Sequence, residues 1–113
     1  MKYMMLVCAD ESAELSPEEE AKVGPRFDAW FKDVTSRGIR LDGDRLQSVS
    51  DATTVRVRDD ELLISDGPFA ETKEQIVGFD IIDCKDLDEA IDVASRHPVA
   101  RFGTIEVRPF WTG

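Results

Sequence analysis

The sequence predicts a single α+β domain in which two helices cover one face of an antiparallel sheet. Three observations predict it: short apolar or alternating runs typical of strands, two segments with helical periodicity, and a first helix and a last helix that each lie between strands. The chain has 113 residues, of which 42% are hydrophobic, and this is enough for one core. We therefore expect one domain over residues 1–113.

The first strand and the first helix are clearly marked. Residues 3–9 form an apolar run bounded by acidic residues, which is typical of a strand that is covered on both faces. Ser16 begins a helix-capping pattern, and apolar residues recur at helical spacing over 23–34 until Gly38 offers a C-terminal cap. Because Pro25 lacks a backbone donor and the residue before a proline avoids helical dihedrals, we expect a kink or two abutting helices near Val23.

The middle of the chain predicts one weak strand and a hairpin. Residues 39–46 look extended but are charged, and 47–52 resemble a loop. Residues 53–58 alternate between polar and apolar side chains, Asp59-Asp60 turns the chain, and 62–65 return. The alternation predicts that one face of this hairpin is exposed to solvent.

The last third predicts a strand, a helix and a final strand. Residues 76–84 are an apolar strand, Asp86 caps a second helix, Pro98 prevents its continuation, and 104–110 alternate again. The full order is strand, helix, strand, hairpin, strand, helix, strand. This order predicts a ferredoxin-like βαβ…βαβ sheet with an extra hairpin and both helices on one face.

The first strand also predicts the assembly. Since it is apolar on both faces and the two helices cover only one face of the sheet, the other face needs a partner. A second copy related by a two-fold axis is the simplest partner, so we expect a homodimer.

Charge and motifs exclude several function classes. With 24 acidic and 14 basic residues the net charge is −10, which repels phosphate backbones and argues against direct binding of nucleic acid. The N-terminal apolar run is too short for a signal peptide or a membrane span, so we expect a cytoplasmic protein that does not associate with membranes. One histidine among dispersed carboxylates is no metal-ligand set, and without a Gly-rich phosphate loop no organic cofactor is expected.

The segment from Asp66 to Phe69, Asp-Gly-Pro-Phe, has two interpretations. As a turn, it uses Gly67 for a positive φ, Pro68 for a fixed φ and Phe69 as an anchor in the core. As a site, it directs Asp66 into a cleft as acid, base or ligand anchor, while Pro68 and Phe69 exclude water. Lys73 belongs either to a solvated face or to a contact with an anionic ligand.

Four further residues are candidates for a site. His97 lies at a helix end, where it caps the helix as a cation or serves as a proton shuttle or ligand contact. Asp80 and Glu106 each lie in mid-strand between apolar neighbours, so we expect both to face away from the helices and to line a polar pocket, or else to form ion pairs. Arg45 suits carboxylate or phosphate recognition or a surface ion pair.

Three segments carry a family resemblance: MKYMMLV at the start, TTVRVRDDELLISDGPFAETKEQIVGFDIIDCKDLDEAI in the middle and EVRPF near the end. Over nearly its whole length the chain resembles the DGPF branch of the YCII-related family. The resemblance implies a dimeric α/β barrel of ferredoxin-like subunits.

The resemblance also implies two functions of different classes. One is enzymatic, from a histidine and an aspartate typical of the YCII branch, but the first helix here has no histidine and His97-Pro98 stands where that branch has Asp-Pro. The other is a regulatory role beside sigma factors, to which some DGPF domains are fused. We favour a homodimer with a small-molecule-binding cleft and acid and base candidates in Asp66 and His97. The alternative is a regulatory module that contacts a protein of the transcription machinery.

Overall fold

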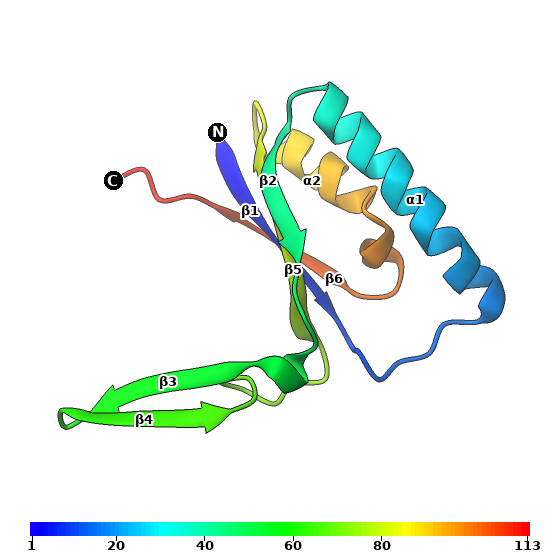
Figure 1. Cartoon of the computed structure of the whole chain (residues 1–113). Helices are drawn as coiled ribbons and strands as arrows, with labels where there is room; N and C mark the ends of the chain where they lie inside the picture. The colour runs from blue at the N-terminus through cyan, green and yellow to red at the C-terminus, as the bar shows by residue number, and fades with distance from the viewer.

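The computed structural model describes residues 1–113 as a four-stranded antiparallel sheet with both helices on one face and a separate hairpin (Figure 1). The strand order in the sheet is β2-β5-β1-β6, so the ferredoxin-like α+β prediction with an extra hairpin is confirmed. The elements are β1 (Lys2–Ala9), α1 (Pro17–Ser36), β2 (Arg40–Arg45), η1 (Val49–Asp51), β3 (Thr53–Arg58), β4 (Glu61–Asp66), β5 (Gln75–Asp83), α2 (Leu87–Ser95), η2 (Pro98–Arg101) and β6 (Thr104–Pro109), where η marks a short 3₁₀ helix. None of the helices is both long and apolar enough to span a bilayer.

The register of β1 determines which side chains face the helices. Residues that are paired across a sheet share a face. Tyr3 pairs with Ile82 and both are buried beneath the helices, as is Met5. The intervening residues of β1 and β5 point to the other side, which we call the open sheet face; its central residues are Met4, Leu6, Phe79 and Ile81.

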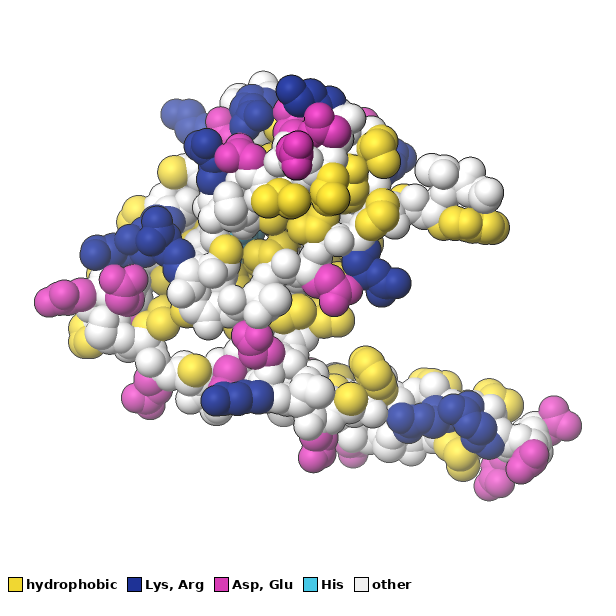
Figure 2. All heavy atoms as spheres, turned by 180° about the vertical axis from the view of Figure 1, so that it is seen from behind, with side chains coloured by type: hydrophobic (Ala, Val, Ile, Leu, Met, Phe, Trp, Pro, Cys, Tyr) yellow, Lys and Arg dark blue, Asp and Glu magenta, His cyan; other side chains and the backbone are white.

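The β3–β4 hairpin forms an arm (residues 53–66) that leaves the body on the side of the sheet opposite the helices (Figure 1). Its turn uses Asp59 and Asp60 at φ 51° and 62°, the left-handed values that a two-residue hairpin turn requires. Figure 2 shows a wide notch between this arm and the body. The hairpin prediction is confirmed, but almost the whole arm is exposed rather than one face of it.

Helix α1 begins and ends where the sequence predicts but is continuous between. Ser16 Oγ accepts a hydrogen bond from the Glu19 amide at 3.2 Å, and Gly38 follows the helix at φ 68°. The expectation of two abutting helices is wrong, because one helix runs through Pro25. Pro25 lies on the exposed side of the helix, where water can satisfy the carbonyl that its missing N–H leaves free.

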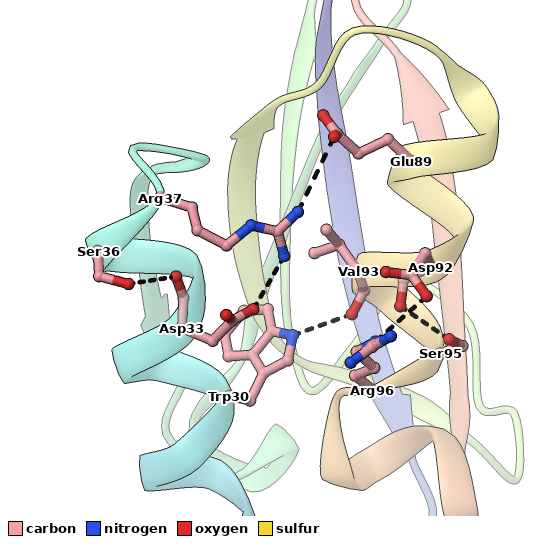
Figure 3. A network of polar contacts seen from close by, with 9 residues as sticks. All are labelled: Trp30, Asp33, Ser36, Arg37, Glu89, Asp92, Val93, Ser95 and Arg96. Atoms are coloured by element: carbon pink, nitrogen blue, oxygen red, sulfur yellow. Dashed lines mark hydrogen bonds and ion pairs between the residues drawn. The ribbon is translucent and has the colours of Figure 1, made fainter.

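Helix α2 has the predicted cap, and Arg37 ties it to α1. The Asp86 carboxylate accepts from the Glu89 amide at 2.9 Å, and the Glu89 side chain accepts in return from the Lys85 amide. Arg37 lies 3.0 Å from Asp33 and 3.9 Å from Glu89, so it bridges the two helices (Figure 3). All these groups are exposed enough that each bridge contributes little by itself.

The core lies between the two helices and the sheet. Within it the Trp30 indole donates a 2.9 Å hydrogen bond from Nε1 to the Val93 carbonyl (Figure 3). This bond joins α1 to α2 inside the apolar layer. The buried side chains of the cluster are Tyr3, Met5, Trp30, Val34, Ile39, Ile82, Cys84, Ala90, Val93 and Ala94.

Replacing Trp30 by phenylalanine should lower the free energy of unfolding by about 1–3 kcal/mol, because the Val93 carbonyl loses its buried donor. Urea denaturation followed by circular dichroism measures this difference. Trp111 is the matched control: it is 92% exposed, so Trp111→Phe should change the stability by less than about 0.5 kcal/mol. Equal losses of stability in the two variants would contradict a stabilising role for the hydrogen bond from Trp30 to the Val93 carbonyl.

Candidate functional site

A cleft of about 560 Å³ opens between α1 and the sheet, beside the start of the arm. Its walls come from α1, from β2 and β5, and from the segment that follows α2. The lining includes the rings of two helix residues, Phe27 and Phe31, and the polar residues Arg40, Asp44, Arg45, Asp80 and His97.

Arg40 and Asp80 form a buried ion pair in this cleft. Arg40 Nε donates to Asp80 Oδ1 at 2.8 Å and Nη2 donates to the Gly43 carbonyl at 2.7 Å, while the guanidinium carbon lies 4.8 Å from the centre of the Phe31 ring. The two side chains are 17% and 8% exposed. Arg40 Nη1 and Asp80 Oδ2 have no protein partner, and neither is sealed off from solvent, so both can meet a ligand.

The backbone beside this pair approaches it closely at Gly43. A Cβ at that position would collide with the Asp80 carboxylate and would lie 2.8 Å from Arg40 Nη2. Only glycine therefore leaves room for the pair. Burial raises the pKa of Asp80, and the hydrogen bond and charge of Arg40 offset part of this effect.

The prediction that Asp80 faces away from the helices is wrong. Asp80 pairs in register with Met5, which is fully buried, so both point to the helix side of the sheet. Glu106 does face away, because it pairs with Leu6 on the open sheet face, and it lies 3.7 Å from exposed Arg108. The two carboxylates are thus on opposite faces, and each has an ion-pair partner.

His97 lies at the inner end of the cleft. The residue is 4% exposed, and its ring meets Trp30 edge-on at 4.8 Å and Phe27 at 6.0 Å between ring centres. Nδ1 accepts a 3.1 Å hydrogen bond from the Val99 amide, so His97 is the N-cap of η2. The expectation of a cationic cap at a helix C-terminus is therefore wrong, although the ring does cap a helix.

Burial fixes the charge state of His97. It lowers the pKa of the imidazole to about 4, so the ring is neutral at neutral pH. Because Nδ1 accepts from a backbone amide, the hydrogen-bond network assigns the remaining proton to Nε2. Nε2 has no protein partner and is not sealed off, so it is an available donor toward the cleft.

The Asp-Gly-Pro-Phe segment lies elsewhere, at the root of the arm. Asp66 is exposed and is not among the residues of the cleft that contains His97. Gly67 adopts φ 94°, and its amide donates to the Ala52 carbonyl at 2.7 Å, as a turn requires. Phe69 is 78% exposed, so the expectation that it anchors the loop in the core is wrong; the loop runs along the arm's root, away from the helix layer.

Pro68 and Lys73 line a second, shallower depression of about 710 Å³ with Asp10, Glu11 and neighbouring polar residues. Of the eight predicted site residues, the cleft brings together Arg45, Asp80 and His97. Sequence reasoning missed Arg40 as well as the site role of Phe27 and Phe31. Arg40 lies 40 positions from its partner, so no local signal marks it, and the two rings were assigned to the apolar stripe of the helix.

The two cysteines and the acidic residues do not form a disulfide or a metal site. Cys8 and Cys84 are free thiols, and burial raises the pKa of both. No group of three histidine, cysteine or acidic side chains converges as metal ligands would.

Comparison with known proteins identifies the family of the chain. The sequence matches the family profile described as the YCII-related domain over residues 1–112. It is also 40% identical, over 113 residues, to an uncharacterised protein of Rhizobium meliloti (strain 1021), in an alignment that covers 96% of this chain and 91% of the relative. The chain therefore belongs to the YCII-related domain family.

Proposed function

We propose that this protein binds a small molecule in the cleft between α1 and the sheet. One observation carries the proposal: His97 is buried and neutral, yet its Nε2 donor has no partner in the protein and lies in the same cleft as the Arg40–Asp80 pair. A donor that no protein group occupies and that solvent can still reach is free to pair with an oxygen atom of a ligand in the cleft.

The lining of the cleft specifies the chemistry of the ligand. Phe27 and Phe31 offer exposed ring surface, which favours a flat or apolar part. His97 Nε2–H and the free Nη1 of Arg40 are donors, which favours a carbonyl, carboxylate or phenolic oxygen. The volume of the cleft suits a small organic molecule rather than a polymer.

An enzymatic role in the same cleft would give the proton-accepting task to Asp80. Its pKa is raised by burial, and Oδ2 is free. His97 would act as a neutral donor, because its Nδ1 is already occupied, and with Arg40 it would stabilise negative charge on a ligand oxygen. The corresponding reaction class is removal of a proton next to a carbonyl group.

The proposal includes a homodimer that covers the open sheet face. Met4, Leu6, Phe79 and Ile81 form an apolar strip on that face, and no element of the chain lies over it (Figure 1). A regulatory module that contacts a basic protein of the transcription machinery remains the alternative function. The cleft with its unpaired donors favours ligand binding, since a pure interaction module needs no such cleft.

A thermal-shift screen tests the binding function. We expect small carboxylates, ketones and phenols, with benzoate, pyruvate and catechol as first probes, to include one that raises the melting temperature, because a ligand of the native state stabilises it by about 2.7 kcal/mol at 100 times its Kd. His97→Asn keeps an acceptor for the Val99 amide but removes Nε2–H, so it should abolish the shift. Asp66→Asn is the matched control and should leave the shift intact.

Two outcomes would count against the cleft. A shift that survives His97→Asn but disappears in Asp66→Asn would move the site to the root of the arm. The absence of any shift across the screen, with the protein folded, would favour the regulatory alternative. Quenching of Trp30 fluorescence, whose ring contacts His97, provides an independent readout of binding in the cleft.

A further inference from the structure

The arm carries an apolar surface that nothing in the chain covers. Val55 pairs with Ile64 and Val57 pairs with Leu62, so these four side chains share one face of the hairpin. They are between 58% and 63% exposed. We call this surface the apolar arm face; the opposite face carries Arg56, Arg58 and Glu61 together with one leucine, Leu63.

The arm has little support from its own chain. β3 and β4 pair only with each other, and Figure 1 shows them projecting beyond the open sheet face. A two-stranded hairpin by itself is marginally stable in water. An arm with an uncovered aliphatic face therefore needs a second surface to pack against.

The surface area of the chain indicates how large that second surface is. The accessible area is 8150 Å² and only 15 of 113 residues are buried, whereas a compact monomer of this mass exposes about 6,200 Å². The surplus of about 1,900 Å² is more than twice the roughly 800 Å² that each partner buries in a stable interface. The radius of gyration, 16.1 Å against about 13 Å for a compact chain of this length, agrees with this surplus.

The geometry favours a second copy of the chain as the occupant. Each chain has two uncovered apolar surfaces, the open sheet face and the apolar arm face. Figure 2 shows hydrophobic side chains on both the arm and the body, with the notch between them. A two-fold axis applies every contact twice, so one arrangement covers both surfaces in both copies. Two packed sheets lie about 10 Å apart and a six-residue strand spans about 20 Å, so an arm reaches past the partner's sheet.

We propose that the arm is a clasp: its apolar face packs against a second copy of this chain and holds the two open sheet faces together. This inference rests on the proposed homodimer and is independent of ligand binding in the cleft. It assigns a role to a segment that the cleft does not use.

Light scattering coupled to size-exclusion chromatography tests the clasp, with dilution series to obtain the dissociation constant. The double substitution Val57→Thr with Ile64→Thr keeps strand-forming residues but removes apolar surface, and it should weaken dimerisation at least about 100-fold. Leu63→Thr alters the opposite face and should change the constant by less than about threefold. The Trp30 environment and the circular dichroism spectrum verify that each variant keeps its folded body.

The outcomes distinguish the clasp from the pairing of open sheet faces and from ligand binding in the cleft. A dimer that survives the double substitution but dissociates in Phe79→Asp would overturn the clasp and leave the pairing of open sheet faces intact. Equal weakening by Leu63→Thr would overturn the assignment to the apolar arm face. A monomeric wild type would overturn both clasp and dimer, while the ligand screen would still report on the cleft.

Discussion

Replacing Arg40 by methionine is expected to lower the free energy of unfolding at pH 7 by about 3–5 kcal/mol, because it leaves the Asp80 carboxylate buried without its counter-charge. The pair is joined by a 2.8 Å hydrogen bond and the Asp80 side chain is only 8% exposed, so water hydrates the carboxylate too little to compensate for the lost guanidinium. Methionine keeps an apolar chain over the Phe31 ring. Urea denaturation of the variant and the wild type gives the difference directly.

A second substitution makes this result specific to charge. Adding Asp80→Leu to Arg40→Met removes both charges, and the double variant should recover most of the lost stability. The deficit of the single variant should also shrink in acid. A carboxyl whose pKa is raised by folding favours the folded state when protonated, so stability is regained as the pH falls through the folded-state pKa. A loss below about 1 kcal/mol at pH 7 would show that the pair is not buried in solution.

Acidification from pH 7 to pH 4 is expected to remove about 3 kcal/mol of stability through His97 alone. Folding lowers the pKa of this imidazole from 6.5 to about 4, because its ring is enclosed by Trp30 and Phe27. At about 1.36 kcal/mol for each pKa unit, this contribution is fully present above pH 6.5 and is lost as the pH falls toward 4. The unfolded chain binds the proton first, so acid favours unfolding.

His97→Asn isolates this effect. Asparagine accepts the Val99 amide as an N-cap does, but it does not titrate, so the variant should lack the decline between pH 6.5 and 4 that the histidine causes. The many carboxylates titrate in both proteins and cancel in the difference. Chemical denaturation at four or five pH values is sufficient. If the free energy of unfolding of the wild type and of His97→Asn depended on pH in the same way, the His97 ring would be exposed to solvent in solution.

The fold could be predicted because its signals are local. Ser16 and Asp86 cap the two helices through side chains three residues from the amides that they accept, and Asp59-Asp60 turns the hairpin through its own backbone angles. Continuity of α1 through Pro25 could not be predicted. It depends on which side of the helix faces solvent, and the packing of the domain decides this.

The site was harder to predict because its contacts are distant in sequence. β5 is apolar on both faces, so alternation alone does not tell which face of the sheet Asp80 joins, and the buried Met5 opposite it decides the matter. Arg40 meets Asp80 through a β-bulge between Arg40 and Asp42 that a charged strand does not reveal. His97 was recognised as a candidate, but its neutral state follows from tertiary burial.

The position of β1 in the middle of the sheet has a consequence for how the chain folds. β1 is the first strand to be synthesised, yet its partners are β5 and β6, and Tyr3 is paired with both Ile82 and Pro109. Such pairings close long loops, and contacts between distant residues slow folding. The two helices and the hairpin can form early, because their contacts join neighbouring residues. Until β5 and β6 pair with it, β1 remains without hydrogen-bonded neighbours, and its apolar side chains remain exposed. We therefore expect completion of the sheet to be a late step in folding, because it requires β6 as well as β5.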